Sequence, residues 1–208
     1  MERTRDGGLR AARVLLACSV VVLVPLWALA AIGSPPGWEL TLTRRLNDAS
    51  GVVAAVLWPV MQLGTMWSAF AVGALVAARR RPWRATAVVA SGVGAWVAAK
   101  AVKALVGRAR PLAYLPGLDV REGSGTGLGF ASGHAAVAFA LAAALAPALP
   151  RRWRAVAYLA ASAVGVARVV YGVHLPLDIA GGAAVGLATA SAVELALWSM
   201  RTEERVGD

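Results

Sequence analysis

The sequence has little charge and almost no cysteine. Only 15% of its 208 residues are Asp, Glu, Lys or Arg, whereas 59% are hydrophobic, and the mean hydropathy is +0.64. Soluble domains carry roughly 25% charged residues. The composition therefore excludes a disordered chain and argues against a water-soluble domain. The single cysteine, Cys18, excludes an internal disulfide framework and a metal centre built from several cysteines.

Acidic residues are scarce relative to basic ones. The chain has 21 Lys and Arg against 11 Asp and Glu, which gives a formal net charge of +10. In a soluble protein such an excess would suggest a nucleic-acid partner. In so apolar a chain it is more typical of the cytoplasmic loops of a membrane protein. We therefore expect no nucleic-acid partner.

Two long stretches contain no charge at all. The first has 25 residues, between Arg13 and Glu39, and the second has 30, between Asp48 and Arg79. A helix crosses the hydrocarbon core of a bilayer with about 20 apolar residues, so both stretches are long enough. Basic residues before the first stretch leave a cleaved signal peptide as the alternative. Since the run exceeds the usual ~7–15 residues of a signal core, we favour an uncleaved membrane helix.

Hydrophobic runs and turn residues predict an all-α, six-span transmembrane helical bundle in one polytopic domain, residues 1–208. A short interfacial helix is expected at 49–57. Residues 111–131, which are rich in proline and glycine, are expected to form a long loop. The six spans are expected near residues 14–33, 58–78, 84–104, 134–150, 154–172 and 177–199.

Arginine flanks alternate ends of these spans, which predicts their orientation. Thirteen arginines fall on one side of a six-span protein, and positive charge favours the cytoplasmic side. Both termini are therefore expected in the cytoplasm. The thirteen are Arg3, Arg5, Arg10, Arg13, Arg79, Arg80, Arg81, Arg84, Arg151, Arg152, Arg154, Arg201 and Arg205.

Eight basic residues do not follow this pattern. Three of them, Arg44, Arg45 and Arg121, are interpreted as ordinary loop charges. The others gather at the outer ends of the third and fifth spans, where charge at membrane depth usually faces a cavity or a pathway. These are Lys100, Lys103, Arg108, Arg110 and Arg168. Glu194, an isolated carboxylate near the inner end of the sixth span, is interpreted as a helix-packing or snorkelling residue.

Three segments at the predicted outer face concentrate polar residues. In the first, 103–111, Lys103 and Arg110 are seven residues apart, so they share a face if the helix continues between them. Pro111 ends or bends the chain directly afterwards. Two cations on one helix face suit an anionic ligand.

The second segment, 131–134, precedes an uncharged alanine-rich run. Ser132 is a plausible N-cap for the fourth span. The amides of Gly133 and His134 would then face an anion, helped by the helix dipole. Simple capping, with His134 as an ordinary interfacial residue, is the alternative.

The third segment, 167–178, joins the fifth and sixth spans. Asp178 follows His174 by four residues, close enough to accept a hydrogen bond from one imidazole nitrogen. Such a bond fixes the tautomer and leaves the other nitrogen as a nucleophile. A merely structural hydrogen bond is the alternative. Pro176 suits the first turn of the sixth span.

Taken together, these segments resemble the three signature motifs of the type 2 phosphatidic acid phosphatase superfamily. The superfamily includes membrane lipid phosphate phosphatases and polyprenyl diphosphate phosphatases. The order of the motifs and the spacing inside each match. Two positions depart from the pattern: Ala131 stands where the family usually has Pro, and Ala167 where it usually has Ser. We expect these departures to affect rate or substrate range.

The resemblance implies an integral membrane hydrolase that cleaves a lipid phosphate monoester or diphosphate without a metal or other cofactor. By carry-over, His174 is the nucleophile that forms a phosphohistidine, Asp178 orients it, and His134 is the general acid and then the general base. The residues implied to hold the phosphate are Lys103, Arg110, Ser132, Gly133 and Arg168.

The apolar runs and the arginine pattern, together with this resemblance, predict a multi-pass protein of the inner (plasma) membrane with its site on the extracytoplasmic side. The partners are then the bilayer and the lipid phosphate substrate, while the oligomeric state and the identity of the lipid stay open. A non-catalytic protein that binds or transports a lipid phosphate through the same basic pocket is the alternative. It would need the cations but not both histidines and Asp178.

Overall fold

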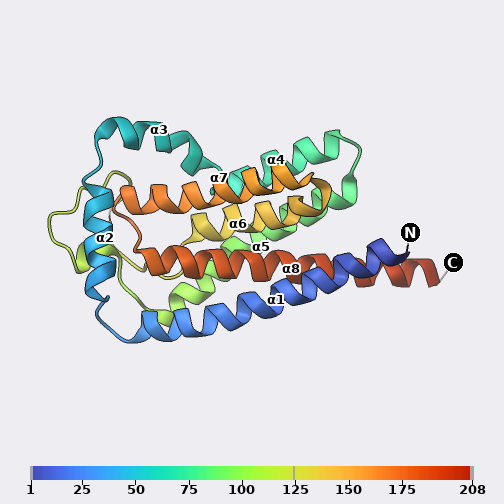
Figure 1. Cartoon of the computed structure of the whole chain (residues 1–208), viewed down its shortest axis with the longest axis horizontal. Coiled ribbons are helices and arrows are strands. Elements are labelled where there is room, and N and C mark those ends of the chain that lie inside the picture. Colours follow the sequence, from blue (N-terminus) through green and yellow to red (C-terminus); the bar gives the residue numbers. More distant parts are fainter. Residues whose placement is uncertain (1, 124, 207–208) are drawn as a thin grey trace.

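The computed structural model describes residues 2–123 and 125–206, and the side chains of 7–123 and 125–200. Within these residues the chain is all-helical, with α-helices and short 3-10 helices and no β-strand, as predicted. Most of the helices lie side by side along one direction, and α2 crosses one end of them (Figure 1). Both termini lie at the opposite end (Figure 1).

The elements follow one another with short connections, except for the long segment between η1 and α6. Their bounds are α1 Glu2–Ala31, α2 Gly37–Asn47, α3 Gly51–Gln62, α4 Met66–Ala78, α5 Pro82–Val106, η1 Pro111–Ala113, α6 Gly133–Leu145, η2 Ala146–Ala148, α7 Arg151–Val170 and α8 Pro176–Val206. The expected loop at 111–131 is therefore present, with a 3-10 turn at its start.

Several of these helices are long and apolar enough to cross a bilayer. Among the described residues, four qualify alone: Gly7–Ala31, Pro82–Val106, Arg151–Val170 and Pro176–Met200. The pair α3 and α4 makes a fifth if it counts as one span bent by 56°. The apolar segment Gly133–Ala148 is shorter. The chain is a multi-pass membrane protein. The topology prediction also used Arg3, Arg5, Arg201 and Arg205, whose side chains lie outside the described residues.

The predicted second span, 58–78, is wrong as a continuous helix. The chain breaks between Gln62 and Met66, and the expected short helix at 49–57 extends to Gln62 as α3. The break occurs where the backbone passes the start of α6: a Cβ on Gly64 would lie 2.7 Å from the carbonyl oxygen of His134. Thr65 then caps α4, since its side chain accepts a hydrogen bond from the Ser68 amide (3.4 Å).

Helix α2 was not predicted, and it buries polar side chains. Its buried residues are Glu39, Thr43 and Asn47, one on each successive turn. Asn47 donates to the carbonyls of Asp119 (2.8 Å) and Val170 (2.9 Å) and accepts from the Asp119 amide (2.9 Å). The polar face of α2 thus ties the long loop to the end of α7.

The middle of the bundle is built from small residues. Most of α6 is buried, and it packs against α5, α7 and α8. Gly182 and Gly186 of α8 face α6, where a Cβ on Gly182 would lie 2.5 Å from the Ser132 carbonyl oxygen. Small residues four apart let two membrane helices approach closely. This close approach fixes the start of α6 relative to the start of α8.

Candidate active site

A cavity of about 780 Å³ lies where the ends of several helices and the long loop meet. Its wall includes the break between α3 and α4, the last turns of α5, the start of α6 and the loop before α8. All three sequence segments contribute to it. The candidate site residues that line the cavity are Lys103, Arg110, Gly133, His134, Arg168 and His174.

Lys103 and Arg110 reach this cavity by a route that differs from the predicted one. The helix does not continue between them, because α5 ends at Val106 and Gly107 adopts a left-handed conformation (φ 70°). The chain then turns and pairs with residues 127–129. The Arg110 amide donates to Gly127 (3.0 Å), and the Gly129 amide donates to Arg108 (2.7 Å). Two adjacent segments, rather than one helix face, bring the cations together.

The Lys103 ammonium binds the same loop segment. Its Nζ donates to the carbonyl oxygens of Leu128 (3.3 Å) and Gly129 (2.6 Å). Lys100, one turn earlier, also lines the cavity and lies 3.7 Å from the ring centroid of Trp96. The sequence indicates Lys100 as one of the clustered cations, without a predicted role. Its placement adds a further cation to the cavity wall.

Ser132 caps α6 from a fully buried position. Its Oγ accepts from the Ala135 amide (3.5 Å), and its own amide donates to the Asp178 carbonyl (2.8 Å). The cap leaves the first turn of α6, with Gly133 and His134, against the cavity. Ser132 itself stands behind that wall. Helix N-termini present unpaired amides that favour an anion.

His174 and Asp178 are within reach of each other, as their spacing suggested. His174 Nδ1 lies 3.3 Å from Asp178 Oδ2, which also accepts from the Leu175 amide (2.9 Å). Both side chains are buried. Burial, together with the charges of Lys103, Arg168 and Arg110, lowers the pKa of His174 well below its usual value, although a backbone hydrogen bond with Gly129 opposes this. A lowered pKa favours the neutral imidazole, which is the form that could act as a nucleophile.

Arg168 approaches the cavity from the last turn of α7. Its Nη1 donates to Glu122 and to the Met61 sulfur (3.2 Å). Its Nε is buried and has no hydrogen-bond partner in the part of the chain that the structure describes. An unsatisfied buried donor is costly. The neighbouring Ala167 is fully buried in an apolar cluster with Met61.

Two residues behind the cavity were not among the predicted site residues. Arg108 was predicted only as one of the clustered cations, and no role was predicted for Glu39. Both side chains are buried, and they form an ion pair. Arg108 also contacts Asp178 (3.1 Å). The sequence does contain a signal for Glu39. Residues 37–47 carry a polar residue at every fourth position, namely Glu39, Thr43 and Asn47, which indicates one polar face on a helix.

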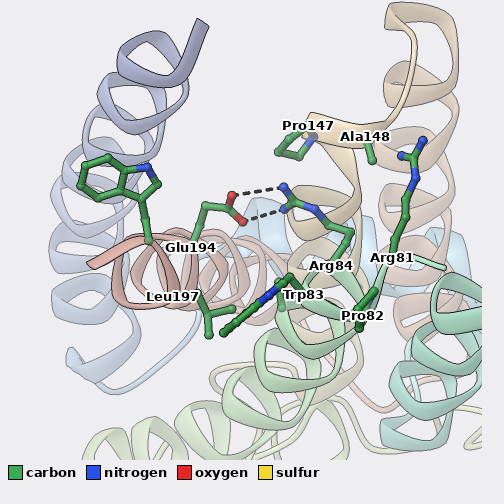
Figure 2. A pocket seen from close by; sticks show the side chains of 10 residues that line it. Arg81, Pro82, Trp83, Arg84, Pro147, Ala148, Glu194 and Leu197 are labelled. Carbon is green, nitrogen blue, oxygen red and sulfur yellow. Dashed lines mark hydrogen bonds and ion pairs between the residues drawn. The ribbon is translucent and has the colours of Figure 1, made fainter. Parts of the chain in front are cut away.

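A second cavity, of about 360 Å³, lies between the start of α5, η2 and the later turns of α8 (Figure 2). Arg84 of α5 and Glu194 of α8 pair across it through two hydrogen bonds, of 2.6 and 3.2 Å, and Arg84 also donates to the Ala144 carbonyl (3.2 Å) (Figure 2). Glu194 thus joins α8 to α5, in keeping with the helix-packing interpretation. This cavity holds neither histidine.

Within the described residues, no three His, Cys, Asp or Glu side chains form a group that could hold a metal ion. The cavity instead gathers cations of the protein itself around two histidines. That no metal takes part in the chemistry stays a prediction, and it is testable with a chelator.

The family comparison and the structural comparison of this chain with known proteins agree with each other. A family model described as the PAP2 superfamily matches residues 82–202. The structure of LpxE from Aquifex aeolicus is similar, with a TM-score of 0.71, 21% identity, and 78% of this chain and 98% of that chain covered. A transmembrane PAP2-type phosphatidylglycerolphosphate phosphatase from Bacillus subtilis gives a TM-score of 0.66 and 20% identity, with 84% and 93% covered. No curated protein sequence matches the chain.

Proposed function

This chain belongs to the PAP2 superfamily, and from that premise we propose that it is a membrane phosphatase acting on a lipid phosphate monoester or diphosphate. One observation carries the proposal. Six of the residues singled out in the sequence line a single cavity, and Asp178 contacts His174 from behind. Cations, helix-terminal amides and a neutral imidazole in one cavity suit phosphoryl transfer.

The proposed first step is covalent. The unprotonated Nε2 of His174 attacks phosphorus in line, so that a nitrogen–phosphorus bond forms as the bond from phosphorus to the leaving oxygen breaks. His134 donates a proton to that oxygen. Asp178 accepts a hydrogen bond from Nδ1 and stabilises the positive charge that develops on the imidazole.

The proposed second step releases phosphate. His134, now neutral, takes a proton from a water molecule, whose oxygen attacks phosphorus from the side that the leaving group vacated. The nitrogen–phosphorus bond breaks, and the electron pair returns to His174. Inorganic phosphate leaves, and both histidines regain their starting protonation states.

Three cations hold the phosphate oxygens through both steps. Lys103, Arg110 and Arg168 all line the cavity, and charge-assisted hydrogen bonds from such groups are shorter and stronger than neutral ones. The amides at the start of α6, including that of Gly133, add donors. Ser132 serves this arrangement through its cap, which holds the first turn of α6 in place.

A lipid substrate fits the composition of the cavity wall. Beside the cations, the wall contains Met66, Trp67, Trp96 and Leu128, and Trp67 is largely exposed on the outside of the bundle. A phosphate head group then contacts the cations, while the lipid chain extends past the apolar residues into the bilayer. The similarity to a phosphatidylglycerolphosphate phosphatase supports the same class of substrate.

The proposed topology has six crossings and both termini in the cytoplasm. It counts the bent pair α3–α4 as one crossing and α6 with η2 as another. Both termini lie at the end of the bundle opposite α2 (Figure 1). The basic residues Arg79–Arg81 lie between α4 and α5, and Arg151–Arg154 lie at the start of α7, after η2. Under the positive-inside rule the cavity then faces the extracytoplasmic side of the plasma membrane.

The test is phosphate release by purified protein from a panel of lipids in mixed micelles: phosphatidic acid, phosphatidylglycerophosphate, a polyprenyl phosphate and a polyprenyl diphosphate. We expect turnover of at least one lipid. His174→Ala should lower kcat by roughly 10³-fold or more, as loss of a nucleophile does. EDTA should leave turnover of the wild-type protein unchanged.

The phosphohistidine has its own readout. In His134→Ala, water activation is impaired, so ³²P from labelled substrate should accumulate on the protein in an acid-labile form, and adding His174→Ala should abolish that label. A wild-type protein that binds the lipids but releases no phosphate from any of them would instead favour the binding or transport alternative. Strong inhibition by EDTA would contradict a metal-free reaction.

A further inference from the structure

Glu39 is a buried carboxylate that belongs to the candidate site although it lies far from the signature motifs in sequence. It is in α2, outside residues 82–202 that match the family model, and its side chain is fully buried. An unpaired carboxylate in such a position would be strongly destabilising. Its partners therefore indicate what its position requires.

Both oxygens of Glu39 are engaged. Oε1 accepts from Arg108 Nη1 (3.2 Å) and from the Leu177 amide (2.8 Å), and Oε2 accepts from Arg108 Nη2. Leu177 lies in the first turn of α8, directly before Asp178. Glu39 therefore contacts the helix end that carries Asp178 as well as the guanidinium of Arg108.

Arg108 connects two carboxylates. Its Nη1 donates to Asp178 Oδ1 (3.1 Å) as well as to Glu39, and its side chain is almost completely buried. Burial alone would lower the pKa of Arg108, but its hydrogen bond to Glu39 and the charge of Asp178 raise the pKa above the ordinary value. The guanidinium is therefore charged, and Glu39 and Asp178 share that charge.

The other oxygen of Asp178 faces the nucleophile. Oδ2 accepts from the Leu175 amide (2.9 Å) and lies 3.3 Å from His174 Nδ1. With Oδ1 held by Arg108 and Oδ2 held by Leu175, the carboxylate cannot rotate without losing a buried hydrogen bond. A continuous path of contacts thus runs from Glu39 through Arg108 and Asp178 to His174.

We propose that Glu39 and Arg108 are positioning residues, which fix the carboxylate of Asp178 and through it the imidazole of His174. The inference rests on the proposed function, in which His174 is the nucleophile. Glu39 has a specific part. Its carboxylate accepts hydrogen bonds from both terminal nitrogens of Arg108, so the guanidinium donates to Asp178 through one nitrogen only.

Without the charge of Glu39, Arg108 would be free to form a two-bond pair with Asp178. That pair would draw Oδ2 away from His174, and it would neutralise the charge that stabilises the imidazolium. Substrate contacts with Lys103, Arg110 and Arg168 would not change. The loss should therefore appear in the chemical step and not in binding.

Glu39→Gln tests this, because it keeps the size of the side chain and removes its charge. We expect kcat on the best lipid of the panel to fall on the order of 10²-fold, the effect of a misplaced reacting group, while KM stays within about twofold. Glu39→Asp, which keeps the charge, should recover part of the lost kcat. Unchanged kcat in folded Glu39→Gln would overturn the inference.

The matched control is Glu194→Gln. It removes the same charge from a second two-bond Arg–Glu pair, which joins the start of α5 to the later turns of α8 (Figure 2). We expect kcat and KM in this variant to equal those of the wild type. An equal fall of kcat in both variants would reduce Glu39 to a general stabiliser of the fold and overturn the inference.

A measurement without substrate separates this inference from the proposed function. In ¹⁵N-histidine-labelled protein, the His174 ring should give the signals of the Nδ1–H tautomer, and in Glu39→Gln those of a tautomer mixture. If the wild type hydrolyses no lipid phosphate, the proposed function fails and this comparison alone decides the inference, with unchanged ring signals overturning it. If Glu39→Gln does not fold, Arg108→Lys replaces it under the same expectations.

Discussion

The buried imidazole of His174 has an electrostatic environment set by charges from several elements. Lys103 comes from α5, Arg110 from the loop after it and Arg168 from α7, while Asp178 is the carboxylate in contact. Both burial and the three cations disfavour a protonated ring. In the proposed mechanism, a bound phosphate offsets the charge of these cations and so favours the imidazolium that forms as His174 attacks.

At the residue scale, this predicts that His174 stays neutral in acid. A histidine with the ordinary pKa of ~6.5 is about 90% protonated at pH 5.5, whereas His174 in the folded protein should still give the NMR signals of a neutral ring at that pH. His174→Gln identifies the resonance by its loss.

The same shift has a consequence for stability. The folded pKa of His174 lies below the unfolded one, so the unfolded chain binds the extra proton and the free energy of unfolding falls as pH drops below about 6.5. His174→Gln should therefore lose less thermal stability between pH 7.5 and 5.5 than the wild type. A His174 ring that titrates near pH 6.5 would contradict the prediction.

At the scale of elements, the long apolar helices were predictable from the hydrophobic runs of the sequence. The spans predicted near 84–104, 154–172 and 177–199 correspond within a few residues to the apolar helical segments Pro82–Val106, Arg151–Val170 and Pro176–Met200. Helix α8 itself continues to Val206. The break at Gly64 was not predictable in the same way, because it depends on contact with His134, seventy positions later. Helix α2 was not predictable either. Its polar side chains are buried because Glu39 and Asn47 form hydrogen bonds with groups far away in the sequence.

In the candidate site, too, contacts between residues close in sequence were predictable and contacts between distant residues were not. Short-range relations such as the cap of Ser132 and the reach from His174 to Asp178 were readable from spacing. The joint placement of Lys103 and Arg110 was expected for the wrong reason, since a loop pairing replaces the helix. Glu39 pairs with a residue 69 positions away, and no local pattern specifies such a partner.

The packing of α8 against α6 gives a prediction about an element. A Cβ on Gly186 would overlap the carbonyl oxygen of Ala136, so Gly186→Ala should force the helices apart. Overpacking of this kind costs about 1–3 kcal/mol, which should lower the melting midpoint in detergent. Gly51→Ala is the control, because an added Cβ there meets nothing within 4 Å. Equal midpoints for the two variants would exclude this close contact as a source of stability.

At the scale of the whole molecule, the two ends of the bundle differ in chemistry. One end carries the cavity, the polar face of α2 and the long loop, and the other carries both termini and the basic turns before α5 and α7 (Figure 1). Cations serve both ends in different ways. Those of the basic turns are suited to holding the protein's orientation in the membrane, whereas those of the cavity are suited to an anion.

This asymmetry predicts how cysteines at the two ends will react. In a Cys18→Ser background, Ala113→Cys in η1 and Ala78→Cys at the end of α4 both replace an exposed alanine. In intact cells a membrane-impermeant maleimide should label Ala113→Cys at once. It should label Ala78→Cys only after the membrane is permeabilised. The reverse order would contradict the extracytoplasmic site.

A third variant, with a cysteine appended after Asp208, tests whether α6 crosses the membrane. Three crossings separate η1 from the C-terminus if α6 and η2 span the bilayer together with α7 and α8. The appended cysteine should then behave like that of Ala78→Cys. If the segment Gly133–Ala148, which is shorter than the other candidate spans, does not cross, only two crossings remain and the appended cysteine is labelled together with Ala113→Cys. Labelling of the C-terminus in intact cells would therefore exclude six crossings. Protection of it would require α6 to cross, with its N-terminal amides and His134 at the outer face beside the cavity.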